Sequence, residues 1–271
     1  SAVEELPLNL SSLSCLIDFS AGGCRSLKQV PTRVGGLNSL FQLQLDSTPI
    51  ETLPEEISHL PVIQKLELRN CKSLKSLPAS IGGMDTLKIL HLEGSNIAEL
   101  PEDFGKLEKL VMLRMNKCKD LKKLPESFGG LKALRHLYME ETSVVELPES
   151  FGNLSKLRVL KMMKRPLFRS ESDALGTSEE PRFVLPDSFS NLLKLDELDA
   201  RTWGISGKIP DVFEKLTSMR LLNLGNNYFH SLPASLRGLT NLRELSLYDC
   251  QELMSLPPLP FKLEKLNLAN C

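Results

Sequence analysis

The sequence repeats a Leu-Pro or closely related step at a nearly constant interval along its whole length. The prolines of this series lie 23 or 24 residues apart, except for one interval of 38 residues before Pro186. A fixed period in the range of about 20–29 residues is typical of arrays in which each unit buries its apolar face against its neighbours. The series consists of Pro7, Pro31, Pro54, Pro78, Pro101, Pro125, Pro148, Pro186, Pro210, Pro233 and Pro257.

Leucine dominates the repeated unit, and the chain contains 55 leucines in 271 residues. In each Leu-x-Leu step both leucines point to the same side of a strand, because strand side chains alternate between faces. We therefore predict an α/β leucine-rich repeat solenoid of about 11 repeats of 23–24 residues, with a curved parallel sheet on the concave face and irregular or short helical segments on the convex face. One unit reads Leu40, Leu43, Leu45, Thr48, Ile50, Leu53, Pro54 and Ile57.

The spacing predicts three further features that recur in each repeat. Eleven strands are expected with centres near Ser20, Gln44, Glu67, His91, Arg114, Tyr138, Lys161, Asp199, Asn223, Ser246 and Asn267. Three residues after each proline, an apolar spine is expected on the convex side, formed by Ile57, Ile81, Phe104, Phe128, Phe151, Phe189 and Phe213. After each strand a Cys, Ser, Thr or Asn turns inward, where its side chain can bond local backbone.

We predict a single leucine-rich repeat domain over residues 1–271, cut at both ends, because polar capping units are absent from the pattern. The longer proline interval indicates an insertion over residues 164–183 within the seventh repeat. Loops of this length in compact domains are either functional or disordered. The insertion is therefore a second candidate for ligand contact, with inert length variation as the alternative.

Composition and motifs argue against several classes of function. The formal net charge is −1, whereas a protein that binds a phosphate backbone usually carries a basic excess. No apolar run approaches the length of a membrane span. The sequence has no phosphate-binding loop, nucleophile elbow or zinc-protease motif, and His91 and His136 lie two repeats apart. We therefore expect no enzyme activity, no catalytic residue, no cofactor, no metal, no nucleic acid and no membrane.

The cysteines indicate a reducing compartment. Cys71 and Cys118 are 47 residues apart, which is two repeats and about 10 Å in a stacked sheet. A disulfide requires Cα atoms within about 7 Å, so we expect small buried thiols instead. Cys250 and Cys271 are one repeat apart, and a bridge between them stays open as an alternative. Buried thiols favour the cytosol or nucleus.

Exposed apolar and aromatic residues cluster on the predicted concave face of strands four to seven. A contiguous mixture of this kind is typical of a protein-binding patch, the alternative being a solvated strand surface. The concave candidates are Ile89, His91, Glu93, Met112, Arg114, Asn116, His136, Tyr138, Glu140, Val159, Lys161 and Met163. The candidates in the insertion are Arg165, Leu167, Phe168 and Arg169.

The units resemble the leucine-rich repeats of plant intracellular immune receptors. The run Leu66-Glu-Leu-Arg-Asn-Cys71-Lys-Ser-Leu-Lys-Ser-Leu-Pro78, which alternates with Leu92-Glu-Gly-Ser-Asn-Ile-Ala-Glu-Leu-Pro101, is most similar to the TIR-type nucleotide-binding leucine-rich repeat (TIR-NB-LRR) disease resistance proteins. The resemblance implies a domain that senses a pathogen effector directly or through a guarded host protein. It also implies contacts with the nucleotide-binding domain that hold the receptor inactive, and defence signalling that ends in the hypersensitive response.

Two other readings remain open. A scaffolding repeat protein of the plant Ras-group type shares the period, but it would carry Asn throughout the inward column. An extracellular receptor ectodomain would carry glycans at Asn9 or Asn153, each of which begins an Asn-Leu-Ser sequon, and would pair its cysteines. The segment Gly204-Ile-Ser-Gly-Lys-Ile-Pro210 is similar to a turn of such ectodomains.

Overall fold

The computed structural model describes residues 3–7, 10–164, 183, 185–209, 211 and 213–271. The chain divides into two compact units, Ser1–Leu157 and Arg158–Cys271, which are called unit 1 and unit 2 below. Each unit is described by itself. The single domain expected over residues 1–271 stays a prediction, and most of the insertion expected over 164–183 lies outside the described residues.

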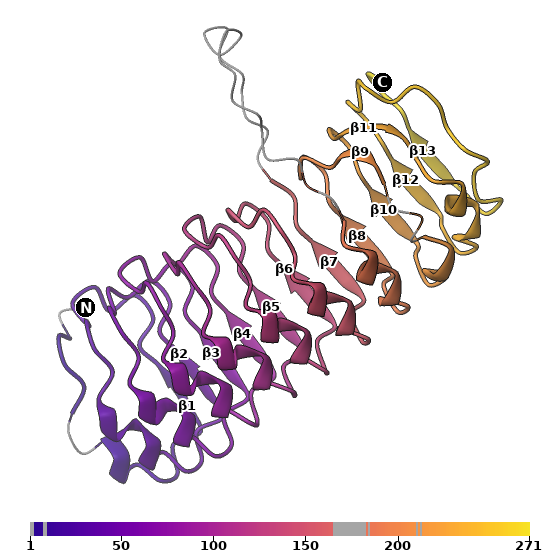
Figure 1. Cartoon of the computed structure of the whole chain (residues 1–271). Helices are drawn as coiled ribbons and strands as arrows, with labels where there is room; N and C mark the ends of the chain where they lie inside the picture. Colours follow the sequence, from indigo (N-terminus) through magenta and orange to yellow (C-terminus); the bar gives the residue numbers. More distant parts are fainter. Residues whose placement is uncertain (1–2, 8–9, 165–182, 184, 210, 212) are drawn as a thin grey trace, which may run out of the picture. The chain divides into compact units, whose positions relative to one another are not determined.

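Both units are built on parallel strands of three residues each (Figure 1). The eleven predicted strands are confirmed, but each residue expected at a strand centre is the third and last residue of its strand. Unit 1 holds the order β1 Asp18–Ser20, β2 Gln42–Gln44, β3 Lys65–Glu67, β4 Ile89–His91, β5 Met112–Arg114 and β6 His136–Tyr138. Unit 2 holds the order β7 Val159–Lys161, β8 Glu197–Asp199, β10 Leu221–Asn223, β12 Glu244–Ser246 and β13 Lys265–Asn267.

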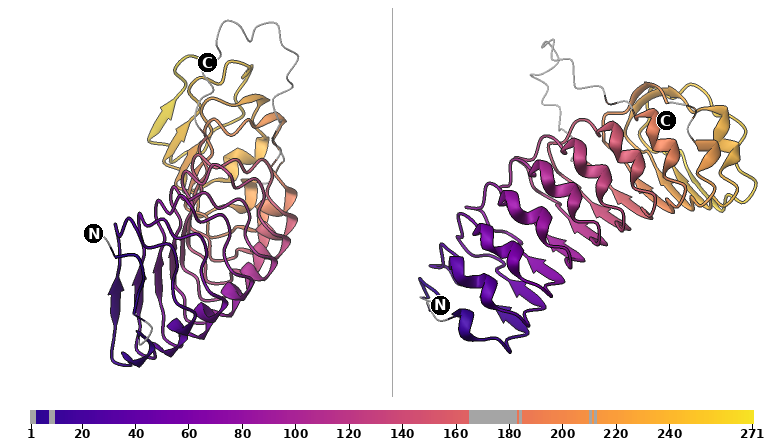
Figure 2. Two further views of the ribbon diagram at one scale, coloured as in Figure 1. Left: turned by 90° about the vertical axis from the view of Figure 1, so that its left-hand side faces the viewer. Right: turned by 60° about the horizontal axis from the view of Figure 1, so that its bottom comes forward.

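Short 3-10 helices line the opposite face of each unit from the strands (Figure 2). Most begin directly after the repeat proline, which has extended backbone angles such as φ −70° and ψ 150° at Pro54. Proline is tolerated there because the first amides of a helix have no partner within the helix. The helices are η1 Leu10–Ser12, η2 Thr32–Gly36, η3 Glu55–His59, η4 Ala79–Gly83, η5 Glu102–Lys106, η6 Glu126–Gly130 and η7 Glu149–Asn153 in unit 1, and η9 Asp187–Asn191, η10 Phe213–Lys215 and η11 Ala234–Gly238 in unit 2.

The core of each unit lies between these two layers. Leucines in the strands and directly after them, such as Leu90 and Leu92, are fully buried, as is every residue of the predicted convex spine. In unit 1 the rings of Phe104, Phe128 and Phe151 stack in register, with centroids 6.2 and 6.0 Å apart. The leucine-rich repeat solenoid fold predicted from the spacing is therefore confirmed.

The inward polar column bonds backbone as expected, and it also joins neighbouring repeats. Thr48 Oγ1 donates to the carbonyl of Leu45 at 2.7 Å, and the thiol of Cys71 in the next repeat donates to the same carbonyl at 3.2 Å. Ser95 and Cys118 share the carbonyl of Leu92 in the same way, at 2.7 and 3.1 Å. A Cys unit is thus paired with the Ser or Thr unit before it through one shared acceptor.

Glycines recur where neighbouring 3-10 helices approach each other closely. A Cβ atom on Gly82 would lie 2.3 Å from the carbonyl oxygen of Asp103 in η5, and one on Gly105 would lie 1.8 Å from that of Ser127 in η6. Gly83, the neighbour of Gly82, would bring its Cβ only to 3.4 Å from Ser58. The repeated glycines therefore allow one column of helices to stack at the spacing that the strands set.

Unit 2 contains a second sheet that the sequence pattern did not predict. Strand β9, Ser206–Lys208, pairs in parallel with β11, Tyr228–Ser231. Beside them, Asn227 Oδ1 accepts a hydrogen bond from the Ile205 amide at 2.9 Å. Trp203 is buried and meets Phe183 edge to face at 5.2 Å, so its ring packs in the core of unit 2. Within the described residues, no helix has the length and apolar character that crossing a membrane demands.

Candidate functional site

The side chains that point away from the leucine core form what we call the strand face of each unit. In unit 1 the register of the parallel strands aligns these side chains in rows that run across the repeats. Two rows lie within the strands and a third follows them. The rows are Gln42, Lys65, Ile89, Met112 and His136; Gln44, Glu67, His91, Arg114 and Tyr138; and Asp46, Arg69, Glu93, Asn116 and Glu140.

Arg69 is the centre of an ion network at the strand face of β2–β4. Its Nη1 atom lies 2.8 Å from Asp46 Oδ2 and 2.7 Å from Glu67 Oε1, and its Nε lies 3.7 Å from Glu93 Oε2. The Glu67 side chain is only 3% exposed and also contacts Lys65 at 3.1 Å. A carboxylate buried to this degree requires compensating charge, because loss of its hydration is costly. We call Asp46, Glu67, Arg69, His91 and Glu93 the Arg69 network.

His91 belongs to this network, although it was predicted as a partner-binding residue. The residue is 7% exposed, and its Nδ1 atom accepts a hydrogen bond from the Arg69 guanidinium. Burial, and next the positive charge of Arg69, lower the pKa of His91 to about 4. Glu67 lies 3.6 Å away and opposes this shift, but an Nδ1 that accepts from a guanidinium carries no proton. His91 is therefore neutral at pH 7 and offers little surface to a partner.

Next to the network, β4–β6 present a second surface, which combines an arginine and aromatic side chains with apolar ones. The guanidinium of Arg114 lies over the ring of Tyr138, 4.5 Å from its centroid, which is a cation–π contact. Ile89, Met112 and His136 are half-buried beside them. We call Ile89, Met112, Arg114, His136 and Tyr138 the β4–β6 patch.

The third row closes one side of this patch with a reciprocal amide–carboxylate pair. Asn116 Nδ2 donates to Glu140 Oε2 at 2.9 Å, and the Glu140 amide donates to Asn116 Oδ1 at 2.9 Å. Glu93, which lies in the same row, has its pKa raised by burial, and the charges of Arg69 and Arg114 oppose this rise. These predicted binding residues are thus partly engaged with each other.

The remaining predicted residues lie in unit 2 or outside the described residues. Val159, Lys161 and Met163 are half-buried on and after β7 of unit 2, where Lys161 pairs with Glu197 at 2.8 Å. Lys164 lies 4.7 Å from the centroid of the Trp203 ring, and burial lowers its pKa. Arg165, Leu167, Phe168 and Arg169 of the insertion lie outside the described residues. The structure brings together the candidates of β4–β6 and, separately, those of β7.

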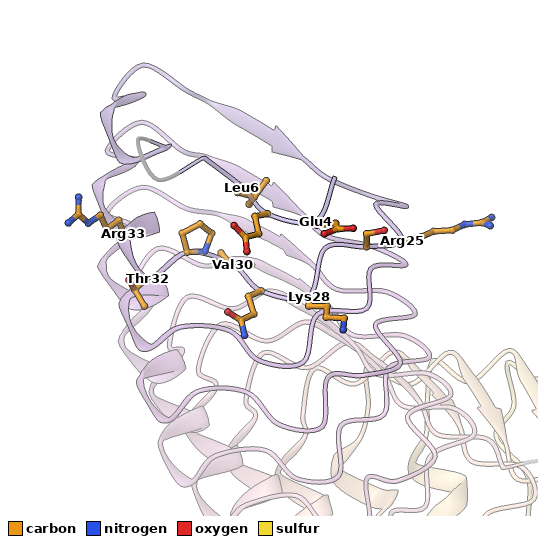
Figure 3. Close-up of a pocket in the computed structure, with 11 residues that line it drawn as sticks. Glu4, Leu6, Arg25, Lys28, Val30, Thr32 and Arg33 are labelled. Carbon is orange, nitrogen blue, oxygen red and sulfur yellow. The ribbon is translucent and has the colours of Figure 1, made fainter. Parts of the chain in front are cut away.

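An open groove of about 790 Å³ lies near the N-terminal end of unit 1 (Figure 3). One side is formed by Glu4, Glu5 and Leu6, and the other by the segment from Arg25 to Arg33. Its lining mixes carboxylates and cations rather than presenting an apolar pocket. The sequence analysis did not identify this groove.

The arrangement favours binding over chemistry. Burial raises the pKa of the Cys118 and Cys250 thiols to about 11 and also raises that of Cys71, so these thiols stay protonated and weakly nucleophilic at neutral pH. In the portion that the structure describes, no three His, Cys, Asp or Glu side chains come close enough together to hold a metal ion. What the strand face offers is a set of fixed charges and half-buried apolar groups.

Sequence reasoning missed Arg69 as the centre of the network. The signal was present, because Asp46 precedes Arg69 by 23 residues and Glu93 follows it by 24, which places opposite charges in one row of neighbouring repeats. Opposite charges at adjacent positions across strands stabilise a sheet. A comparison of equivalent positions in neighbouring repeats would have shown Arg69 between Asp46 and Glu93.

Comparisons with known proteins give a consistent picture. A family model described as a leucine-rich repeat region matches residues 84–177. The TMV resistance protein N of Nicotiana glutinosa is 34% identical over 94 residues, which are 34% of this chain and 8% of that protein. A probable disease resistance protein of Arabidopsis thaliana is 36% identical over 63 residues, 23% of this chain and 4% of that protein. The chain thus matches less than a tenth of the length of these relatives.

Solved structures show the same fold at low sequence identity. A leucine-rich repeat protein of Leptospira interrogans superposes with a TM-score of 0.62 at 22% identity, over 99% of this chain and 82% of that one. The Arabidopsis receptor kinase HAESA, solved with a peptide hormone and a co-receptor, gives a TM-score of 0.63 at 22% identity, over 93% of this chain and 42% of that one. These likenesses concern the solenoid architecture alone.

Proposed function

We propose that this chain, which is a leucine-rich repeat domain of the plant disease resistance family, is the recognition module of an intracellular immune receptor. In this proposal the domain senses a pathogen effector, directly or through a guarded host protein. It also contacts the nucleotide-binding domain and contributes to autoinhibition until the effector is present. NAD cleavage and nucleotide binding are assigned to TIR and nucleotide-binding domains, and not to the repeats. The location is the cytoplasm, the nucleus or both.

The observation that carries the proposal is the contrast within the strand face of unit 1. The Arg69 network neutralises its own buried carboxylate, so it holds β2–β4 in one arrangement. The β4–β6 patch places Arg114 and Tyr138 side by side among half-buried apolar groups. Arg and Tyr are enriched at protein-binding hot spots because each combines a large contact area with a polar group. We therefore assign effector or guardee contact to this patch.

The cysteines support the proposed compartment. Cys71, Cys118 and Cys250 are buried, unbridged thiols whose hydrogens are donated to backbone carbonyls. Such a column persists most readily where the surroundings keep thiols reduced. The sequence relatives named for disease resistance support the immune-receptor part of the proposal.

A genetic complementation experiment tests the proposal. The gene is disrupted in its plant, and the line is inoculated with a panel of pathogen strains that trigger the hypersensitive response in the parent. We expect the disrupted line to lose the response to one or a few strains, and the wild-type gene to restore it. A gene carrying Arg114→Glu and Tyr138→Ala should accumulate protein normally but fail to restore the response.

Arg135→Glu supplies the matched control, because Arg135 is exposed and directly precedes β6 without belonging to the patch. This control should restore the response as the wild type does. A disrupted line that still responds to every strain would remove the immune-receptor assignment. A double variant that restores full response would remove the β4–β6 patch as the recognition surface.

An extracellular receptor ectodomain is the second candidate, favoured by the exposure of Asn153 in its Asn-Leu-Ser sequon. It predicts a glycan at Asn153 when the full protein is isolated from its plant. Intact-mass measurement of that protein decides between the two, because a mass equal to that of the bare chain with six reactive thiols after denaturation excludes the ectodomain.

A further inference from the structure

A flank of unit 1, separate from the strand face, carries a periodic row of lysines. It is formed by the segments that run from each inward Cys, Ser or Thr to the following repeat proline, together with the segment that precedes Pro7. Its central row is the residue three places before each proline. In chain order this row reads Glu4, Lys28, Glu51, Lys75, Ala98, Lys122 and Val145. In this row lysine therefore appears in every second repeat of unit 1, and each of these repeats is one with an inward cysteine.

The segments of this flank are stacked on one another by backbone hydrogen bonds. The Glu51 amide donates to the carbonyl of Lys28 at 3.0 Å, and the Ala98 amide donates to that of Lys75 at 2.9 Å. Lys28, Lys75 and Lys122 are all exposed. Among the described residues, none of the three lysines takes part in an ion pair. The backbone hydrogen bonds thus hold the row in place, and among the described residues its three lysines are exposed to solvent and form no ion pair with a carboxylate.

The flank is basic although the chain is not. Each cysteine unit adds a second cation near its inward residue, namely Arg25, Lys72 and Lys119, and Lys123 adds one more. Between Cys24 and Pro148 these seven cations face four carboxylates in the same segments, Glu51, Glu99, Asp120 and Glu146, while Glu4 and Glu5 lie before this stretch and the whole chain has a net charge of −1. Among the cations of the flank, and within the residues that the structure describes, only Lys123 has a carboxylate partner, Glu146 at 3.7 Å. We call this surface the lysine flank.

The spacing of the lysines selects the kind of anion that fits. Strands in a sheet are about 4.8 Å apart, so lysines two repeats apart are separated by about 10 Å. An extended polypeptide covers the same distance in about three residues. Glu51 and Ala98 lie between the lysines of this row, and Val145 follows Lys122. Glu51 repels a negative charge, and the two apolar residues do not attract one. A uniform polyanion would meet these positions too, whereas a peptide can place neutral residues over them.

Within the chain itself, an acidic segment already lies beside the first cations of the lysine flank. The N-terminal segment carries Glu4 and Glu5, and it forms one side of the groove whose other side includes Arg25 and Lys28 (Figure 3). The acidic residues Glu4 and Glu5 thus lie next to the repeat that contains Cys24. Arg25 points away from the groove in this view, so its guanidinium stays accessible to a partner.

We propose that the lysine flank is a docking surface for an extended acidic segment of a protein partner, which lies across the repeats and places a carboxylate at about every third residue opposite Lys28, Lys75 and Lys122. The repeat with inward cysteine and the repeat with inward Ser or Thr then have different roles on this flank. The first supplies the cation, and the second supplies the spacer.

Two fluorescent peptides of identical composition test the proposal with the full 271-residue chain. One has glutamate at every third position with Gly and Ser between, and the other has the same glutamates contiguous. By fluorescence anisotropy at low salt, we expect the spaced peptide to bind about tenfold more tightly, with the affinity falling as salt is raised. The variant Lys75→Glu with Lys122→Glu should weaken its binding by about tenfold or more.

The control variant is Lys109→Glu with Lys156→Glu, which makes the same charge change at two exposed lysines that are also 47 residues apart. These lysines lie between a 3-10 helix and the next strand, away from the flank, so binding of the spaced peptide should be kept. Equal affinity for the two peptides, or equal loss in both variants, would overturn the proposal. So would stronger binding of phosphatidylserine vesicles that depends on Lys75 and Lys122, because the flank would then be a general anion surface.

Discussion

Replacing Gly82 with alanine tests whether the glycines of the 3-10 helices exist for close approach. A Cβ at this position would lie 2.3 Å from the carbonyl oxygen of Asp103 in the adjacent helix η5. Carbon and carbonyl oxygen rarely approach closer than about 3.3 Å, so η4 and η5 must separate by about 1 Å. The atom in the way is backbone, which cannot move aside by changing rotamer.

The magnitude follows from two opposing terms. Overpacking of this kind costs about 1–3 kcal/mol, and the lower entropy of the unfolded alanine chain returns about 0.4–1 kcal/mol. We expect Gly82→Ala to lower the free energy of unfolding by about 1–2 kcal/mol. Gly83→Ala is the matched control, because its Cβ would meet Ser58 only at 3.4 Å, an ordinary contact. That variant should be neutral or slightly stabilised.

Hydrogen exchange followed by mass spectrometry suits this measurement, because stability in a repeat array is approximately a sum over neighbours. Amides of η4 and η5 should exchange faster in Gly82→Ala than in wild type, while those of unit 2 should not change. Trp203 is not a useful probe here, since the only Trp of the chain lies in unit 2. If Gly83→Ala accelerates exchange as much as Gly82→Ala, the close-approach explanation is wrong.

Three further predictions concern buried polar groups of unit 1. Ser95→Ala should destabilise the protein by only about 0.5–1.5 kcal/mol in urea unfolding, because Cys118 still donates to the Leu92 carbonyl; a loss above about 3 kcal/mol would contradict this. Cys118, with a pKa raised to about 11 by burial, should resist alkylation at pH 7.5 until the chain is unfolded, and rapid labelling of the native protein would refute its burial. His91, with a folded pKa lowered to about 4, should reduce stability as pH falls below about 6.5, because the unfolded state binds the proton more readily; His91→Gln should show a shallower loss between pH 6.5 and 4.

The parts of the fold that repeat were predictable from sequence, because each column is read many times. The Phe104, Phe128 and Phe151 spine and the inward Thr48 and Cys71 positions follow directly from the period. The strand centres were placed one residue late, since the pattern marks the alternation and not the residue at which pairing ends. The β9–β11 sheet was not predicted, because it occurs once and carries no period.

The strand face was harder to predict, because it depends on contacts between repeats. His91 was chosen for its place in the exposed alternation, yet Arg69 and Glu67 on the neighbouring repeat cover it. Its burial depends on long side chains whose direction no single repeat reveals. Arg114 and Tyr138, by contrast, were chosen from the same alternation and do lie together. Their role in binding stays a prediction.

Removing Arg69 should weaken the pH dependence that His91 gives this region, and the sign can be worked out from the network. In wild type the positive charge of Arg69 helps to lower the pKa of His91, as do Arg114 and Lys65, while Glu67 opposes them. In Arg69→Leu that repulsion is lost, and Glu67 remains 3.6 Å from His91 Nδ1. The pKa of His91 should therefore rise, although burial still lowers it, so that protonation of His91 beside Glu67 costs the folded state less than in wild type.

At pH 7.5 the Arg69→Leu variant should be less stable than wild type by about 3–5 kcal/mol, because Asp46, Glu67 and Glu93 lose their shared cation and Glu67 is buried. As pH falls toward 5, His91 in the variant gains a proton and replaces part of that charge, whereas His91 in wild type is penalised for gaining one. The difference in unfolding free energy should therefore shrink with falling pH. Urea unfolding followed by circular dichroism at pH 7.5, 6.5 and 5.5 measures it, and a constant or growing difference would show that Arg69 does not control the charge state of this face.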